Sequence, residues 1–174
     1  MKKGFTMLEM IVSMGVFAIA VLIGVGSLLA LTNAQKKALV LQSTQDNLRF
    51  ALETIARDIK TGDSYHCADD VSLVQVDCPS GNDSLTFLNV SGATVTFKVS
   101  GNRILRSING GLTFDPITSP DIIIEYLTFY VIGSSISDDF HPRVSIVAKG
   151  VSGSGSTRSE LNLQTTVSQR KIQR

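Results

Sequence analysis

The residues that could do chemistry stand close together at the start of the chain. Glu9 is a single acid directly before a stretch without charged residues that runs from Met10 to Leu31. A carboxylate at the edge of an apolar helix costs about 2–3 kcal/mol in lipid, so such a group usually has a partner or a function. Two interpretations stay open on the residues alone: Glu9 lies at the membrane interface in contact with water, or it meets a cation.

A cation could arise by cleavage after Gly4. Gly4 and Phe5 are a small residue followed by an aromatic one, placed after the basic pair Lys2-Lys3 and ahead of the apolar stretch. Removal of the leader at this point would create a new α-amine on Phe5. The amine of a neighbouring copy could then neutralise Glu9 when two helices pack side by side. The carboxylate would in that case set the register of an assembly.

The apolar stretch is long enough to cross a membrane. As a helix, the residues from Met10 to Leu31 span roughly 33 Å, against about 30 Å for the hydrocarbon core of a bilayer. Lys2 and Lys3 precede the stretch and the next lysine is Lys36, so the positive-inside bias leaves the N-terminus in the cytoplasm. We therefore expect a single-pass inner or cytoplasmic membrane protein whose C-terminal domain is extracytoplasmic.

A basic leader, Gly4, Phe5, Glu9 and a run of apolar residues, in this order, resemble the class III signal of type IV pilins and type II secretion pseudopilins. The resemblance covers Met1 to about Leu31. It implies that a prepilin peptidase cuts after Gly4, that Phe5 is then N-methylated, and that Glu9 meets a neighbour's N-terminus. The implied partners are other pilin or pseudopilin subunits, the prepilin peptidase and the inner-membrane assembly platform, with the lipid bilayer before assembly. An ordinary secretory signal fits less well, because its cleavage would follow the apolar region, where no small-x-small site stands.

The helix should continue to about Lys60, because residues 32–60 contain neither Pro nor Gly. Apolar residues repeat on one face: Leu41, Leu48, Leu52, Ile55 and Ile59. Charged residues fall on the other side: Asp46, Arg49, Glu53 and Arg57. Packing on the chain's own C-terminal domain is favoured over a coiled-coil stalk, because Thr44 and Gln45 interrupt the heptads. Gly62 should end the helix in a left-handed turn. Residues 47–60 are also similar to minor pilins of the W type and minor pseudopilins of the J type, which favours a minor subunit.

Beyond Gly62 the sequence predicts β-structure. The expected strands are 72–76, 84–89, 93–99, 103–107, 122–131, 143–148 and 160–167. The expected turns are 80–83, 91–92, 100–102, 109–111 and 153–155. We expect a single antiparallel sheet, with 122–131 central, covering the apolar face of the helix. The fold class is therefore α+β, a long N-terminal helix packed on an antiparallel β-sheet head. The expected segments are the leader 1–4, a transmembrane or filament-core helix 5–31, its amphipathic continuation 32–62, and an extracytoplasmic β domain 63–174.

Cys67 and Cys78 are favoured as a disulfide over two free thiols, because the bond is permitted outside the cytoplasm. A metal site made of His66 and the two cysteines lacks the fourth ligand of a closed zinc site. The pairs Asp69-Asp70 and Asp138-Asp139 are better interpreted as solvated carboxylates than as calcium ligands, since the chain has no twelve-residue calcium loop. We expect no metal and no cofactor.

The sequence contains neither a nucleophile elbow nor a phosphate-binding loop, so we expect no enzyme. The net charge of +1 gives no indication of a nucleic-acid surface. The prediction is a structural subunit, of the minor kind, in a type IV pilus or type II secretion pseudopilus. The alternative is a single-pass membrane-anchored protein that does not polymerise and whose outer β domain binds a ligand.

Overall fold

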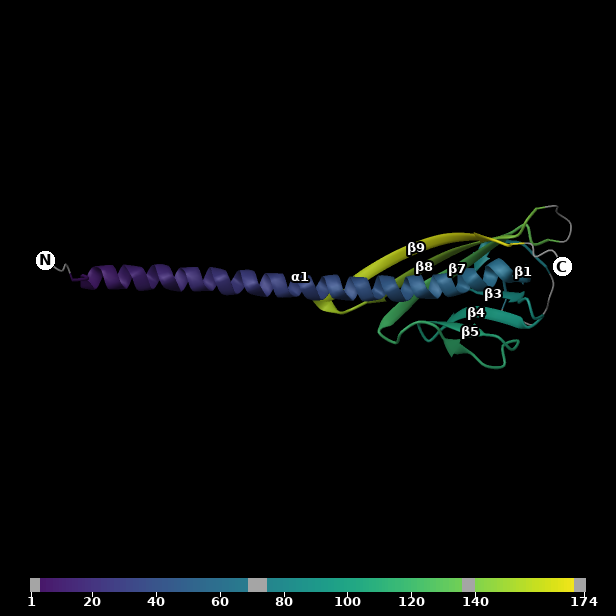
Figure 1. Ribbon diagram of the computed structural model, residues 1–174, viewed down its shortest axis with the longest axis horizontal. Helices are drawn as coiled ribbons and strands as arrows, with labels where there is room; N and C mark the ends of the chain where they lie inside the picture. Colours follow the sequence, from purple (N-terminus) through teal and green to yellow (C-terminus); the bar gives the residue numbers. More distant parts are fainter. Residues whose placement is uncertain (1–3, 69–74, 136–139, 171–174) are drawn as a thin grey trace.

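A computed structural model describes residues 4–68, 75–135 and 140–170, and one helix dominates it (Figure 1). This helix, α1, runs from Met7 to Thr61, as its uninterrupted helix-forming sequence predicts. Its 55 residues extend roughly 80 Å. The first half projects away from the rest of the molecule, and the second half lies along the β head.

The head contains two antiparallel sheets. The first has the order β1-β3-β4-β5-β6 and consists of β1 (Asp63–His66), β3 (Ser84–Leu88), β4 (Thr94–Ser100), β5 (Arg103–Ser107) and β6 (Asp115–Pro116). The second has the order β2-β7-β8-β9 and consists of β2 (Cys78–Asn82), β7 (Ile122–Ile132), β8 (Arg143–Ser152) and β9 (Ser159–Ser168). A short 3-10 helix, η1 (Gly155–Thr157), lies between β8 and β9. The strand β7 is internal to its sheet, as predicted.

The expectation of a single sheet is wrong, and the error starts at residues 80–83. The structure has a strand, β2, where a turn was expected, and it pairs with β7 at the edge of the second sheet. Pro79 is tolerated there because an edge strand leaves one row of amides unpaired. Gly81 is needed for close approach: a Cβ at this position would lie 2.7 Å from Thr128 Cγ2. The chain then passes to the first sheet at Asp83.

Three further strand assignments differ from expectation, and one of them is the two-residue β6, which lies in none of the expected strands. Within the expected strand 72–76, residues 72–74 lie outside the described residues, and Gln75 and Val76 are not in a strand. Conversely β1 was not expected, because its sequence Asp-Ser-Tyr-His has no alternating apolar pattern. The remaining expected strands correspond to β3, β4, β5, β7, β8 and β9, with β8 four residues longer at its end.

The outer half of α1 buries one face against the head, mainly against β8 and β9. The buried residues are Thr44, Leu48, Ala51, Leu52, Ile55 and Ile59. Packing on the chain's own head is therefore confirmed over a stalk. Leu41 is the exception: it is 41% exposed, because at this level of α1 the β8–β9 connection lies against the neighbouring Val40, beside Gly153.

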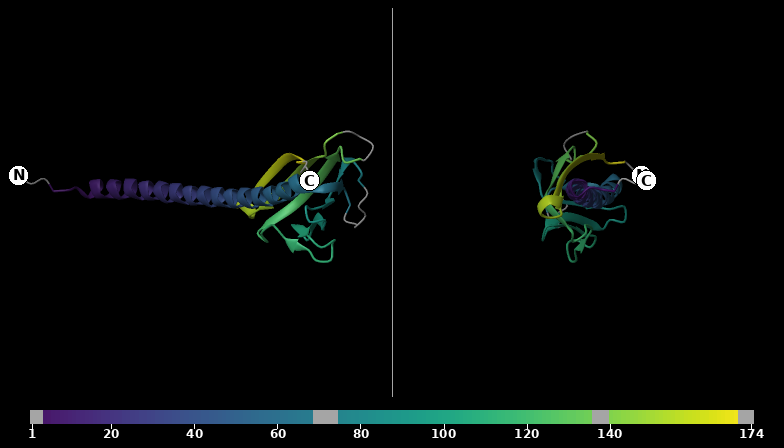
Figure 2. Two further views of the ribbon diagram at one scale, coloured as in Figure 1. Left: turned by 45° about the vertical axis from the view of Figure 1, so that its right-hand side comes forward. Right: turned by 90° about the vertical axis from the view of Figure 1, so that its left-hand side faces the viewer.

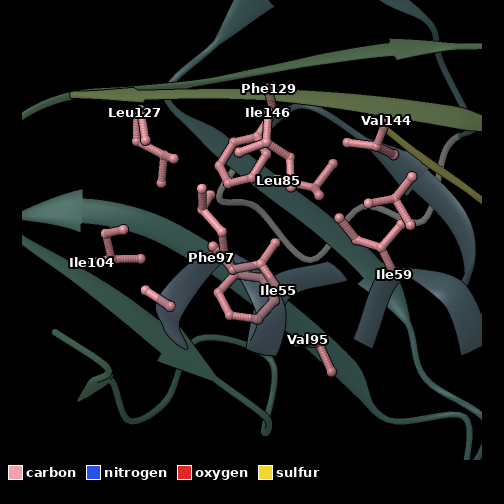
Figure 3. Packing of buried hydrophobic residues seen from close by; sticks show 14 of the residues in the cluster. Ile55, Ile59, Leu85, Val95, Phe97, Ile104, Leu127, Phe129, Val144 and Ile146 are labelled. Carbon is pink, nitrogen blue, oxygen red and sulfur yellow. The ribbon is translucent and has the colours of Figure 1, made fainter. Parts of the chain in front are cut away.

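One hydrophobic core joins the helix and both sheets. Viewed along α1, the strands curve around its outer half (Figure 2). Figure 3 shows apolar side chains from all three parts in one cluster, among them Ile55, Phe97, Phe129 and Ile146. Because strands of both sheets contribute to the same core, the sheets cannot separate without exposing it.

The end of α1 differs from the prediction. Gly62 has φ −82° and ψ 173°, which is extended backbone and not the left-handed turn expected. Glycine is required at this position for steric reasons, because a Cβ there would lie 2.5 Å from Phe87 Cδ2. The residue therefore lets β3 approach the helix end closely.

Candidate assembly site

The bond between Gly4 and Phe5 lies in exposed, non-helical backbone. Both residues precede the first turn of α1, and the Phe5 side chain is 80% exposed. Lys2 and Lys3 lie outside the described residues. The helix takes its N-cap from Thr6, so removal of residues 1–4 would leave the start of the helix intact. The site can thus be cut without loss of the fold.

Glu9 lies in the first turn of α1, and its backbone amide donates a hydrogen bond to Thr6 Oγ1 at 3.3 Å. Thr followed three residues later by Glu is the capping-box pattern. A carboxylate in the first turn also stabilises the helix, because it lies at the positive end of the helix dipole. The sequence interpretation missed this local role, although Thr6 was visible three positions before Glu9. A test of Glu9 must therefore separate its charge from its contribution to the cap.

The first half of α1 exposes apolar side chains on all sides. Every large apolar residue from Phe5 to Leu31 is exposed, from Val21 at 44% to Met7 at 84%. By length and composition, α1 can cross a membrane. Since no other described element covers this surface, it needs lipid or other helices around it (Figure 1).

The structure and the N-terminal residues together define a class of protein. A helix with a bare apolar half, continued by an amphipathic half on an antiparallel head, is a pilin-like architecture. A family model, the prokaryotic N-terminal methylation motif, matches residues 1–25, which contain Gly4, Phe5 and Glu9. This match supports a subunit of the type IV pilin and pseudopilin family. Comparison with curated proteins and with solved structures gave no match.

The motif carries general consequences for partners and location. It implies assembly with other pilin subunits and processing by a prepilin peptidase. With the apolar helix, it indicates membrane anchoring and assembly into a pilus. The match does not separate minor from major subunits, and it does not distinguish the W and J types.

Cys67 and Cys78 form the disulfide that the sequence favoured. Cys67 directly follows β1 in the first sheet, and Cys78 is the first residue of β2 in the second. The bond therefore fastens the two sheets to each other at the end of the head where α1 stops.

The other candidate ligands do not assemble into a site among the described residues. In those parts of the chain, no group of three or more His, Cys, Asp or Glu side chains is placed to hold a metal ion. His66 is buried and His141 is exposed at the surface of the head. The pairs Asp69-Asp70 and Asp138-Asp139 lie outside the described residues.

A groove of about 800 Å³ lies at the end of the head beyond α1. Its lining includes Asp63, Asn89, Phe140, His141 and Arg170. Sequence reasoning did not identify it, because its residues come from four separate segments. Its lining offers an aromatic side chain and charged side chains, which a small ligand could contact.

Proposed function

We propose that the chain is a structural subunit of a type IV pilus or type II secretion pseudopilus. A prepilin peptidase removes residues 1–4 and methylates the amine of Phe5. The helix from Phe5 to Leu31 sits in the membrane with its N-terminus in the cytoplasm, and residues 63–174 form the extracytoplasmic head. On assembly, the apolar helix leaves the lipid and packs among the helices of other subunits.

Glu9 is proposed to meet the Phe5 amine of the neighbouring subunit. Both residues lie at the exposed start of α1, four positions apart. In lipid or in a bundle of apolar helices, an unpaired carboxylate is costly, and an amine of opposite charge lowers that cost. One subunit can therefore accept the next at a defined height along the helix.

The observation that carries the proposal is the bare apolar half of α1 next to an accessible Gly4–Phe5 bond. Mass spectrometry of the native protein tests it. We expect a mature N-terminus at Phe5 that carries one methyl group. A native protein that retains Met1 would reject the proposal. Replacing Gly4 with Val, which puts a branched side chain at the cleavage point, should leave the leader attached.

The minor kind of subunit is the finer part of the proposal. It is supported by the similarity of residues 47–60 to minor pilins of the W type and minor pseudopilins of the J type. The ratio of this chain to other subunits in sheared filaments tests it. A chain that makes up most of the filament mass would be a major subunit.

The second candidate is a membrane-anchored protein that binds a ligand and does not polymerise. The groove at the end of the head favours it, since its lining offers polar and aromatic contacts. The two candidates differ at the N-terminus, because a permanent anchor has no need of cleavage after Gly4.

A further inference from the structure

The face of α1 that points away from the head carries a row of alternating charges. Its members, called here the charge row, are Asp46, Arg49, Glu53 and Arg57. They follow one another at spacings of three and four residues, so they share one face of the helix. All four are exposed, whereas Leu48 and Ile55, on the opposite face, are buried.

In the described parts of the head, no side chain pairs with this row. Asp58, the acid next to the row, pairs with Arg106 of β5 at 2.8 Å. Within the row, by contrast, Glu53 and Arg57 pair with each other at 3.5 Å while their side chains stay 67% and 77% exposed. An exposed pair one turn apart adds little to the stability of a helix. Fold stability therefore gives little reason for the alternation.

The row is complementary to itself after a displacement of one helical turn. If a second copy lies parallel and is moved outward by four residues, roughly 6 Å, its Arg49 is level with Glu53 of the first copy. Its Glu53 is then level with Arg57. Without displacement each charge faces its own kind, and after two turns Asp46 faces Glu53 and Arg49 faces Arg57. The alternation thus selects one displacement and opposes the neighbouring ones.

We propose that the charge row is the surface on which a second copy of this chain docks, displaced by one helical turn. The proposal rests on the proposed function, because the same displacement brings the Phe5 amine of the second copy level with Glu9 of the first. The two contacts are roughly 65 Å apart on one continuous helix, and they require the same register. Leu39 and Phe50 lie on the same side as the row and are 65% and 63% exposed, which supplies apolar area to such a contact.

The position of the head leaves the charge row free for this docking. The head occupies the opposite side of α1, where strands curve around the buried face (Figure 2). Parallel copies can therefore bring their charge rows together with their heads turned outward. Because one contact uses the charge rows of both copies, the chain should occur in adjacent pairs within a filament.

A single reversal and its compensation test the proposal on the full chain in cells that process it. Glu53→Arg should lower the assembled fraction about tenfold, because Arg49 and Arg57 of neighbours then face a like charge. Asp83→Arg, an equal change of charge on the exposed surface of the head, should leave assembly unchanged. The fourfold inversion Asp46→Arg, Arg49→Glu, Glu53→Arg and Arg57→Glu restores the alternation and should restore assembly.

Crosslinking measures the displacement without altering the row. Gln35 and Leu39 are exposed, four residues apart, on the same side of α1 as the row. When chains with Gln35→Cys and chains with Leu39→Cys are expressed together, mixed 35–39 dimers should exceed 35–35 and 39–39 dimers. Excess same-position dimers would overturn the proposal.

The outcomes separate this inference from the proposed function. A Glu53→Arg chain that is cut at Phe5 and assembles normally overturns the role of the charge row and leaves the pilin-like function in place. A fourfold inversion that folds and matures but fails to assemble also overturns the role of the row. A wild-type chain that keeps Met1 and stays monomeric overturns both.

Discussion

The hydroxyl of Tyr65 lies 2.6 Å from the carbonyl oxygen of Ile59 and 2.6 Å from that of Gly62, so a side chain of β1 closes the end of α1. Tyr65 is fully buried. Burial, with the nearby carboxylate of Asp63 as a smaller cause, raises the pKa of its hydroxyl well above the ordinary value. The phenol therefore stays protonated, and its one hydrogen is shared between the Ile59 carbonyl, in the last turn of α1, and the carbonyl of the C-cap Gly62.

Replacing Tyr65 with Phe removes this donor, while the Gly62 amide still donates to the Ile59 carbonyl and Gln169 Nε2 to the Gly62 carbonyl. Because neither carbonyl is left without a partner, we expect the free energy of unfolding to fall by about 0.5–1.5 kcal/mol. Tyr126→Phe is the matched control, because the Tyr126 hydroxyl is exposed and bonds Asn162 at 3.3 Å. Chemical denaturation of the detergent-solubilised chain measures both variants. Equal losses for the two would show that Tyr65 does not hold the helix end.

The pair between Asp58 and Arg106 should matter more than the exposed pair of the charge row. Arg106 Nε and Nη2 both donate to Asp58 Oδ2 at 2.8 Å, and the side chains of Arg106 and Asp58 are 34% and 20% exposed. We expect Asp58→Asn to cost about 1–2 kcal/mol of stability and Glu53→Gln to cost less than about 0.5 kcal/mol. The same denaturation experiment compares them. A larger loss from Glu53→Gln would contradict the assignment of Glu53 to contacts between copies.

Stability should depend on pH through Lys149 of β8 and Glu160 of β9, which belong to one network of charged side chains with Glu125 of β7 and Arg158 just before β9. Lys149 bonds Glu125 at 2.6 Å and Glu160 at 3.2 Å, and Arg158 also pairs with both acids. Hydrogen bonds from Lys149 and then Arg158 lower the pKa of Glu160 below its ordinary 4.5. Bonds from Glu125 and then Glu160 raise the pKa of Lys149 above 10.5.

The sign of the effect follows from these shifts. A lowered carboxyl pKa gives stability that is present above the ordinary value and is lost as the pH falls through the folded value. The raised lysine pKa gives stability that is present below 10.5 and is lost at higher pH. Glu160→Gln should therefore lower the melting temperature at neutral pH, and the difference from the wild type should shrink in acid. A difference that grows on acidification would refute the network.

Reduction of the disulfide should loosen the two sheets. We expect loss of the bond between Cys67 and Cys78 to cost about 2–3 kcal/mol of unfolding free energy, since the bond closes a short loop. The unreduced, denatured chain should contain no titratable thiol. The double variant Cys67→Ala with Cys78→Ala serves as the control, because a reductant should not affect it. Two thiols titrated before reduction would remove the bond from this account.

Much of the fold follows from local patterns, and the exceptions have identifiable physical reasons. The buried face of α1 was visible at Leu48, Leu52, Ile55 and Ile59, because helical period alone determines which residues share a face. The division into two sheets was not visible. Pro79 and Gly81 are typical of a turn, and only their pairing with β7 makes that segment a strand. Likewise β1 is held in place by the hydrogen bond between the Tyr65 hydroxyl and the end of α1. The four-residue sequence of β1 has no pattern that could indicate this contact.

The candidate site was predictable to a different extent. Gly4, Phe5 and Glu9 could be proposed from the sequence because the methylation motif that matches residues 1–25 is linear and needs no tertiary structure to be recognised. The hydrogen bond from the Glu9 amide to Thr6 Oγ1 was not predicted, because Glu9 was interpreted only in relation to the apolar stretch that follows it. The groove at the end of the head was missed because its residues meet only after folding.

The substitution Glu9→Gln tests the central claim most directly, because glutamine at this position of a capping box can keep the helix start while it removes the charge. The measurement is the fraction of mature, N-methylated chain that is recovered in sheared filaments. We predict that Glu9→Gln leaves cleavage after Gly4 and the folded head unchanged and lowers incorporation about tenfold, as expected when a buried amine loses its partner. Incorporation at the wild-type level would contradict the pairing of Glu9 with the neighbour's Phe5 amine.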